Sequence, residues 1–391
     1  MRRQAQMARG DDTLPYDREF IRSGGTSSRS RRKQATFKPP PRERRRAPRR
    51  PGSFLRTLRT VLLLALVLVV VGGVLLGMRA VAFNATVTDT PFISASLLGP
   101  LNGSDRVNVM MVGYGGGDHD GAYLADSIQL LSIDPETDTT TTVPLPRDLW
   151  VEGVAAFPQN GKINETFSIG HLQNDSIDEG AQLLGDVVAT VTGLEVDHWI
   201  TIDFQGFQEM VDAVGGVTVD NPTPFCWTTI EEFHLAGRWE MGCFEQGQLQ
   251  LDGETALQYA RARYTSDVSE STDFARSVRQ ARIIAALRGT IGDGGLGAIV
   301  PGLRLMDAME GRVRTDMSVI DLFLLSSHLS SDRRVELTEG PVLTATTNTI
   351  GQYILIPTGW TGPGDYGTIR AYLETELSQP VSAPGSDAPQ P

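Results

Sequence analysis

The chain has 391 residues, of which 40% are hydrophobic and 21% charged, which excludes a protein too short or too polar to bury a sizeable core. The net charge of −12 hides an asymmetry: residues 1–59 hold eighteen Lys/Arg against five Asp/Glu, and the remainder holds seventeen against 42. A basic arm of +13 on an acidic body of −25 indicates that the arm meets either a nucleic acid or a membrane surface.

The first predicted region, residues 1–57, is rich in Arg, Pro and Ser and poor in apolar residues. Such a composition predicts a disordered basic segment. Its run Arg42 to Arg50 (RERRRAPRR) either holds anionic lipid headgroups or only sets the membrane topology. DNA binding is the weaker interpretation, because no folded reading element accompanies the run.

Residues 58–79 predict a transmembrane helix. The run Val61 to Met78 has no charged residue and is long enough for the roughly 30 Å hydrocarbon layer. A buried core helix is disfavoured, because the run is apolar on every face. Ala80-Val81-Ala82 resembles a signal-peptidase site, but the basic region ahead is far longer than that of a signal peptide, which favours an uncleaved anchor. The basic excess precedes the span, so we expect a single-pass cell-membrane protein with a cytoplasmic N-terminus and an extracellular body.

The body follows a predicted stalk at residues 80–105. Strands expected near residues 107–112, 127–133, 139–143, 199–202, 217–219 and 354–356 alternate with helices near 180–191, 204–214, 273–288 and 317–325. This alternation predicts an α/β domain at 106–375, with a mixed β-sheet flanked by helices as an α/β/α sandwich. The 273–288 helix is expected to bury Phe274, Val278, Ala281 and Ala285. Residues 376–391 are expected to form a disordered tail.

Cys226 and Cys243 are the only cysteines, and the segment between them has the character of a polar loop insertion. Outside the cell two cysteines are free to pair. A disulfide is favoured over a zinc site, because two cysteines lack the companion ligands that zinc needs. The five histidines show no metal-ligand spacing.

Arginines gather in one short stretch of the acidic body. Arg261 and Arg263 are expected on one face of a strand, while Asp273, Arg276 and Gln280 form one stripe of the helix that follows, with Arg279 one step around it. A solvated face with an Asp273–Arg276 pair is the alternative. The acidic background and the convergence of strand and helix favour an anion site for phosphate, which the planar guanidinium fork binds through two parallel hydrogen bonds.

Other candidates lie earlier in the chain. Arg147 follows a proline at a strand end, and Lys162, the only lysine after the membrane segment, lies in Gly161-Lys-Ile-Asn164. Asp126 opens a strand beside a glycine-rich loop with Asp118 and Asp120, where carboxylates suit Mg²⁺ and turn formation is the alternative. The run Gly115 to Gly117 is not a nucleotide loop, because the lysine and the glycine spacing of such loops are missing.

The motifs VNVMMVG, ADS, PLPRDLW, GKIN, DAVGGVTV, LDGETALQYARAR and DFARSVRQ occur in this order. This order resembles the LytR–CpsA–Psr enzymes of bacterial envelopes, by motif over 106–287 and by fold to about residue 375. The resemblance implies a membrane-anchored, extracellular transferase for cell wall assembly. Such an enzyme moves a glycopolymer from a polyprenyl-pyrophosphate carrier onto peptidoglycan and forms a phosphodiester.

The same resemblance implies roles for individual residues. Arg261, Arg263, Asp273 and Arg276 would form the catalytic set, with Asp273 orienting an arginine or assisting proton removal. The pyrophosphate would also contact Arg147 and Arg279, with Lys162, Asn164 and Gln280 adding polar contacts. Asp126 would match a family Mg²⁺ ligand. The chain departs from the family pattern at Gly115, where an Asp is usual, and at Leu124, where an Arg is common; Asp118 or Asp120 is the candidate to replace the missing carboxylate.

Two other functions stay open from the sequence. One is a polyprenyl-pyrophosphate hydrolase that uses water in place of the peptidoglycan acceptor. The other is a non-catalytic envelope sensor or regulator whose basic arm acts in the cytoplasm. The apolar strands and the 204–214 helix either line a channel for the lipid or are simply core, and core is favoured for most of their residues.

Overall fold

The computed structural model describes residues 53–94, 96–97, 99–103, 105–117, 121–292, 299–326 and 333–379. The predicted basic region up to residue 52, Asp118, Asp120 and the predicted tail from residue 380 lie outside these ranges. The folded domain lies wholly within the unit Leu64–Pro391.

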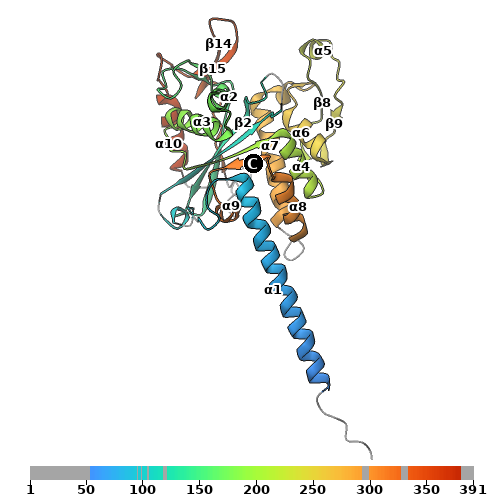
Figure 1. Cartoon of the computed structure of the whole chain (residues 1–391). Coiled ribbons are helices and arrows are strands. Elements are labelled where there is room, and N and C mark those ends of the chain that lie inside the picture. Colours follow the sequence, from blue (N-terminus) through green and yellow to red (C-terminus); the bar gives the residue numbers. More distant parts are fainter. Residues whose placement is uncertain are drawn as a thin grey trace, which may run out of the picture. The chain divides into compact units, whose positions relative to one another are not determined.

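A mixed six-stranded sheet forms the centre of the domain (Figure 1). β1 pairs antiparallel with β2 and parallel with β6, so strand directions are mixed as predicted. The strands, in sheet order, are β12 (Val313–Thr315), β6 (His198–Asp203), β1 (Val107–Tyr114), β2 (Ala125–Asp134), β3 (Thr139–Leu145) and β13 (Arg333–Arg334).

Helices cover both faces of this sheet, which confirms the predicted α/β sandwich (Figure 1). Met110 and Val112 on one face of β1 belong to the larger core, together with side chains of α2 (Ile163–Asn174), α3 (Ile177–Thr192) and α10 (Gly367–Leu377). A second core joins α4 (Phe204–Ala213), α6 (Gly253–Arg261) and α7 (Asp273–Gly292) to the hairpin of β7 (Val217–Asn221) and β10 (Gly247–Leu251). Because side chains alternate along a strand, the opposite face of β1 is left for the functional site.

Smaller elements complete the domain. They are the 3₁₀ turns η1 (Pro100–Asn102) and η2 (Val268–Ser271), the helices α8 (Ile299–Met309) and α9 (Val319–Ser326), the strand pair β4 (Trp150–Val151) and β5 (Gly161–Lys162), and the hairpin of β14 (Leu343–Thr347) and β15 (Tyr353–Pro357). The expected strands and helices are present apart from the strand expected at Arg261 and Arg263, whereas α2, α5, α8 and α10 were not predicted. The apolar residues of α2 and α10 show little helical periodicity, so these two helices derive their stability from packing against neighbours.

The predicted apolar face of α7 is wrong. The helix buries the stripe Arg276, Arg279, Ile283 and Leu287, whereas Ala285 is exposed. These positions follow the i, i+3, i+7, i+11 spacing of one helix face. Two arginines therefore occupy places that a hydrophobicity pattern assigns to solvent.

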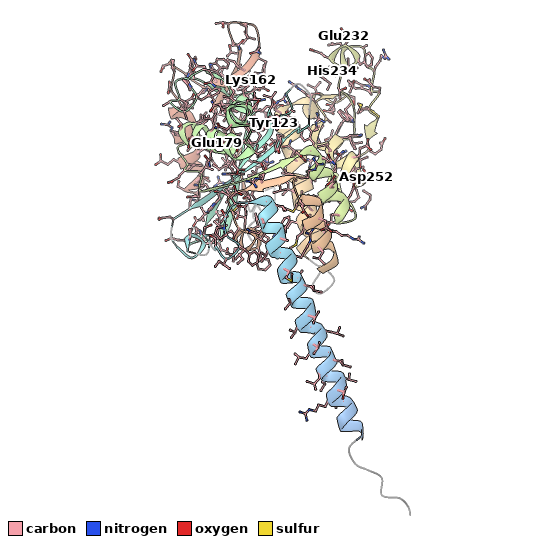
Figure 2. All side chains as sticks on the ribbon, viewed as in Figure 1. Tyr123, Lys162, Glu179, Glu232, His234 and Asp252 are labelled. Carbon is pink, nitrogen blue, oxygen red and sulfur yellow. A yellow bond between two sulfur atoms is a disulfide. The ribbon has the colours of Figure 1, made fainter. Side chains whose placement is uncertain are left out.

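Helix α1 (Ser53–Val87) contains the predicted membrane span and continues eight residues beyond it. Its side chains from Leu58 to Met78 are almost entirely unpacked (Figure 2), and Leu58–Val87 is the one stretch among the described residues that is long and apolar enough to cross a membrane. The predicted stalk at 80–105 is wrong at its start, because Phe83 and Val87 are buried against Val313 in the domain. The apolar run and the domain are joined by uninterrupted helix.

Cys226 and Cys243 form the predicted disulfide. It joins β8 (Phe225–Thr228) to β9 (Cys243–Phe244) and closes a loop that contains α5 (Glu231–Leu235), where Figure 2 labels His234. β8 also pairs with β11 (Tyr264–Thr265), which follows the predicted arginine cluster. The disulfide therefore braces a strand that contacts the cluster directly.

Removing the disulfide should cost about 3 kcal/mol, because it closes a loop of 17 residues and limits the unfolded chain. We expect the double variant Cys226→Ser/Cys243→Ser to show faster hydrogen exchange in β8, β9 and β11 and a lower denaturation midpoint. Met241→Ala, an exposed position in the same loop, is the control and should change neither. Equal exchange in the double variant and the wild type would contradict the bracing role.

Candidate functional site

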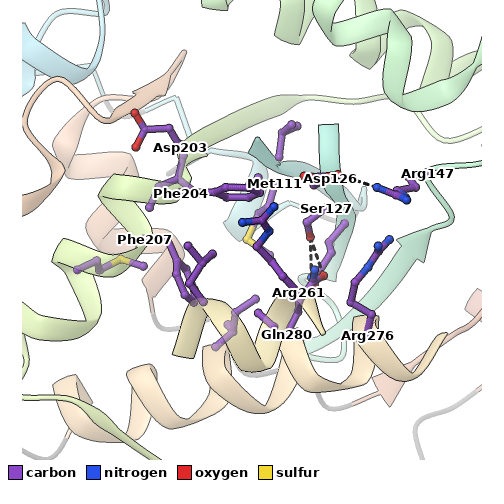
Figure 3. A pocket seen from close by; sticks show the side chains of 18 of the residues that line it. Met111, Asp126, Ser127, Arg147, Asp203, Phe204, Phe207, Arg261, Arg276 and Gln280 are labelled. Carbon is purple, nitrogen blue, oxygen red and sulfur yellow. Dashed lines mark hydrogen bonds and ion pairs between the residues drawn. The ribbon is translucent and has the colours of Figure 1, made fainter. Parts of the chain in front are cut away.

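A cavity of about 820 Å³ lies between the open face of the sheet and helices α4, α6 and α7 (Figure 3). Met111 and Gly113 of β1 and Ser127 and Gln129 of β2 form its floor. The apolar core side of β2, with Ile128 and Leu130, faces the other way. Of the two open interpretations, the channel lining holds for part of β1, whereas the favoured one, core, holds for the apolar residues of β2, whose polar side faces the cavity.

Apolar side chains form most of the cavity wall. Phe204, Phe207 and Met210 come from α4, while Ile284 and Leu287 come from α7. Ile200, Ile202 and Val313 extend the wall across β6 and the edge strand β12. The 204–214 helix thus lines the cavity, as one of the two open interpretations predicted.

The polar end of the cavity holds two arginines that are each paired with a carboxylate. Arg147 Nη1 donates to Asp126 Oδ1 at 2.8 Å, and Arg276 Nη2 lies 2.9 Å from Asp273 Oδ1. Figure 3 shows the Arg147–Asp126 bond and the Arg276 side chain directed into the cavity from α7. The sequence prediction that these distant segments meet is confirmed.

Burial and neighbouring charges act in opposite directions on these two arginines. Burial lowers the pKa of Arg147, but the charges of Asp273, Asp148 and Asp126 outweigh it and the pKa is raised. Burial lowers the pKa of Arg276 to about 10, with Asp273 opposing the shift and Arg147 adding to it. Both guanidinium groups therefore remain charged at neutral pH.

Arg261 and Arg263 differ from this pair, because both are exposed and neither has a carboxylate partner among the described side chains. Arg261 stacks over the Phe204 ring at 4.3 Å and points into the cavity (Figure 3). The predicted strand is wrong: Arg261 ends α6, Ala262 is the cap residue and Arg263 lies in the loop before β11. The helix begins at Asp252, whose side chain caps Thr255 N.

The prediction that Arg279 contacts the substrate is wrong, because Arg279 is a structural residue. Its side chain is fully buried and outside the cavity lining. It donates to the carbonyl oxygens of Tyr259, Ala262 and Glu270 and to the Glu270 carboxylate at 2.6 Å. Burial lowers the pKa of Arg279, with the hydrogen bond that it donates to the Glu270 carboxylate opposing the shift. The residue thus supports the backbone between Arg261 and Arg263.

Lys162 and Asn164 are also placed behind the cavity wall rather than in it. Lys162 Nζ donates to Asp148 Oδ1, and Asp148 is 3% exposed with Arg147 Nε at 3.6 Å. Burial raises the pKa of Asp148, but Lys162, Arg147 and Asp273 outweigh it and the pKa is lowered. Asn164 is buried at the start of α2, where its backbone N–H donates to Arg147 O at 3.3 Å. Both residues therefore support Arg147 from behind.

Lys162→Met should destabilise the protein by about 2 kcal/mol, because the buried Asp148 carboxylate loses its hydrogen-bonded cation and keeps only Arg147, whose Nε lies 3.6 Å away. The double variant Lys162→Met/Asp148→Asn should recover part of this loss, since it removes the stranded charge as well. Urea unfolding at pH 7 measures the cycle. Additive losses in the double variant would show that the two side chains do not act as a pair.

Gln280 lines the cavity as predicted, and its Oε1 accepts a hydrogen bond from Ser127 Oγ at 2.9 Å (Figure 3). Ser127 and Trp227 line the cavity but were not predicted as site residues. Alternation along the strand that begins at Asp126 could have placed Ser127 and Gln129 on one face. Trp227 could not be assigned, because its position depends on pairing between β8 and β11.

The candidate metal site depends on the carboxylate of Asp126. Among the described residues there is no group of three or more His, Cys, Asp or Glu side chains arranged to hold a metal. Asp126 lines the polar end of the cavity, and Asp118 lies outside the described residues. One carboxylate together with phosphate oxygens and water is a donor set that Mg²⁺ accepts. The residues present fit a metal that arrives with a phosphate-bearing ligand better than a resident one.

Two curated relatives of this chain have the same name, teichoic acid transferase TagU. The polyisoprenyl-teichoic acid–peptidoglycan teichoic acid transferase TagU of Oceanobacillus iheyensis is 29% identical over 254 residues, which cover 64% of this chain and 72% of TagU. The Bacillus subtilis TagU is 25% identical over 235 residues, which cover 60% of this chain and 67% of the relative.

Solved structures share the fold. The crystal structure of B. subtilis TagV superposes with a TM-score of 0.51 at 21% identity, covering 71% of this chain and 100% of TagV. A structure of TagT bound to LIIa-WTA gives 0.51 at 18% identity, covering 73% and 93%. At these identities the likeness establishes the fold alone.

The family model of the LytR_cpsA_psr family matches residues 80–358, which contain the sheet, the cavity and both arginine pairs. This range is more than half of the chain and agrees with the motif order in the sequence. The chain belongs to the LytR_cpsA_psr family.

Proposed function

We propose that this protein transfers a glycopolymer from a polyprenyl-pyrophosphate carrier onto peptidoglycan and joins them by a phosphodiester. The observation that carries the proposal is the cavity itself, in which an apolar wall leads to Arg261 and Arg263, neither of which pairs with a carboxylate in the described part of the chain. A carrier with a hydrocarbon chain and a diphosphate has the matching polarity. The relatives named as teichoic acid transferases support this substrate class.

The arginines supply the electrostatics of the reaction. The acceptor hydroxyl oxygen forms a bond to the phosphorus that carries the polymer, the bond from this phosphorus to the bridging oxygen breaks, and polyprenyl phosphate leaves with the electron pair. Arg261 and Arg263 bind the diphosphate directly, and Arg147 and Arg276 stabilise charge that develops on its oxygens. Asp273, held by Arg276 at 2.9 Å, is the candidate to accept the hydroxyl proton.

The proposal includes Mg²⁺, which would bind together with the diphosphate. Asp126 would hold it together with phosphate oxygens, and the ion would neutralise part of the phosphate charge. Asp126→Ala should weaken Mg²⁺ binding in calorimetry with a polyprenyl pyrophosphate present. Unchanged Mg²⁺ affinity in that variant would remove Asp126 from the metal site.

Localisation follows from α1. We infer a single pass through the cell membrane with residues 1–52 in the cytoplasm and the domain outside. The basic excess before the span and the disulfide Cys226–Cys243 support this orientation.

The test uses the full chain in detergent with a polyprenyl-pyrophosphate-linked glycopolymer, Mg²⁺ and peptidoglycan. We expect the polymer to become covalently attached to peptidoglycan and polyprenyl phosphate to appear in equal amount. Polymer phosphate released at the same rate with and without peptidoglycan would indicate the hydrolase instead. If deleting residues 1–50 abolished function in cells while the arginine variants kept it, the regulatory alternative would be favoured.

A further inference from the structure

The last turns of α1 pack against the domain core, so the helix is joined to the domain by buried contacts as well as by the chain. Phe83 and Val87 are buried in a cluster with Val313 of β12, which also includes Met306 and Met309 of α8 and Val319 of α9. Figure 1 shows α8 and α9 at the junction with α1. An apolar contact of this kind holds the helix at a defined angle and height, because cores are close-packed and resist sliding.

Hydrogen bonds and ion pairs also hold the end of α1 against the domain; this contact region is called the α1 joint. Asn84 Oδ1 accepts the N–H of Val319 at 2.9 Å, which caps the first turn of α9, and Asn84 Nδ2 donates to Thr90 O at 2.7 Å. Arg79 pairs with Asp307 on α8 and with Glu310, which directly follows this helix. These bonds tie the last turns of α1 and the segment that follows it to the domain.

The cavity wall and the α1 joint share side chains. Ile200, Ile202 and Val313 line the cavity and also pack in the cluster around the end of α1. The apolar end of the cavity is therefore separated from the last turns of α1 by a single layer of side chains.

Strand register measures the distance from this joint to the polar end. Val313 pairs with Ile202, Ile202 with Gly113, and Gly113 with Ser127, and all four line the cavity. Three steps between neighbouring strands span about 14 Å. Ser127 adjoins Asp126 and bonds Gln280, so the row leads from the α1 joint to the arginines.

Helix geometry measures the height of the joint above the bilayer. The uncharged run ends at Met78, and Arg79 is the first charge beyond it. At a rise of about 1.5 Å per residue, Phe83 lies about 6 Å and Val87 about 12 Å beyond Arg79. The headgroup layer is roughly 5–8 Å thick on each side. The apolar end of the cavity is thus held close to the outer surface of a membrane that α1 spans.

We propose that α1 is a rigid mount that holds the apolar end of the cavity against the outer leaflet, so that the carrier chain enters from the bilayer while its diphosphate reaches the arginines. The domain surface beside the joint contacts the lipid. Phe323 on α9, one helical turn beyond Val319 and 76% exposed, belongs to this surface. The proposal rests on the membrane span and the carrier chemistry of the proposed function.

The first experiment tests the orientation without any activity. The full-length protein has both its cysteines in a disulfide, so a single introduced cysteine can be labelled with a fluorophore. Phe323→Cys is compared with Ile350→Cys in vesicles that contain nitroxide-labelled lipid. Ile350 has the same 76% exposure but lies in the β14–β15 turn, far from α1 in Figure 1. We expect quenching at position 323 and none at 350; equal quenching, or none at either position, would overturn the proposal.

The second experiment changes the height of the mount. Seven polar helix-forming residues inserted between Met78 and Arg79 add two turns and raise the domain by about 10 Å while leaving every contact of Arg79, Phe83 and Asn84 in place. The same seven residues inserted before Ser53 are the control. We expect transfer from a long-chain carrier in vesicles to fall about tenfold or more only for the insertion after Met78, since catalysis is lost when a bound chain is misplaced.

A short-chain, water-soluble carrier distinguishes a failure of the rigid mount from a failure of the proposed transferase function. Both insertion variants should transfer polymer from it at the wild-type rate, because it does not have to reach the cavity from the bilayer. An unimpaired rate with the vesicle carrier after the Met78 insertion would sink the rigid mount. Failure of the wild type with both carriers would instead count against the proposed function, and the quenching result would stand independently.

Discussion

Replacing Arg261 or Arg263 by alanine should reduce transfer by about 10²–10³-fold each, and the double variant should show no measurable transfer. These are the cavity arginines that no described carboxylate neutralises, so their full charge is available to the diphosphate. Arg147 and Arg276 share their charge with Asp126 and Asp273 and are expected to contribute less to initial binding.

The measurement is the initial rate of polymer transfer onto peptidoglycan, with thermal unfolding as the test of folding. Both side chains are exposed, so the variants should unfold within about 0.5 kcal/mol of the wild type. Arg238→Ala is the matched control, because Arg238 is also exposed and stacks on an aromatic ring, Phe233, at 3.9 Å, but lies outside the cavity lining. A folded double variant with wild-type transfer would mean that the diphosphate binds elsewhere.

Arg279→Met should destabilise the protein by about 3–5 kcal/mol, the largest stability effect that we expect from one substitution in the site. The change strands the Glu270 carboxylate, whose partner Arg279 lies 2.6 Å away, and removes donors from three carbonyl oxygens. Because Ala262 O is one of them, the loop that carries Arg263 should also lose its position.

Urea unfolding measures this effect, and hydrogen exchange around residue 262 locates it. Arg282→Met is the control on the same helix, since Arg282 donates to one described acceptor, Tyr259 OH at 3.1 Å, and should cost about 1 kcal/mol. Adding Glu270→Gln to Arg279→Met should restore part of the stability by removing the stranded charge. A loss below that of Arg282→Met would contradict the structural role assigned to Arg279.

Much of the fold follows from local patterns. The strands at β1, β2 and β6 contain runs of β-branched and apolar residues that define them without tertiary context. Helices α3 and α4 have strong apolar spacing and end at Gly193 and near Gly215. Helix α2 was missed because its buried residues include Asn164, Thr166, Gly170 and His171, which hide its inner face from any hydrophobicity pattern.

The sequence predicted some residues of the candidate site correctly and others incorrectly. Arg147, Arg261, Arg263, Arg276 and Gln280 line one cavity as expected. Lys162 and Arg279 carry the same charge and lie in equally suggestive motifs, yet they face inward. Their partners, Asp148 and Glu270, are separated from them by 14 and nine residues through a folded loop, which spacing alone does not reveal.

The sequence by itself determined the apolar span, the alternation of strands and helices, the disulfide pair and the segments that supply the arginines, because each depends on residue type or local periodicity. Only the tertiary structure decided which arginines of the site keep their full charge for a ligand and which are paired with carboxylates, since a neighbouring carboxylate reduces the charge that a guanidinium offers to a ligand. It also decided that α1 runs unbroken into the domain: the burial of Phe83 and Val87 depends on Val313, more than 220 residues away, so nothing near them in the chain distinguishes a rigid joint from a flexible stalk.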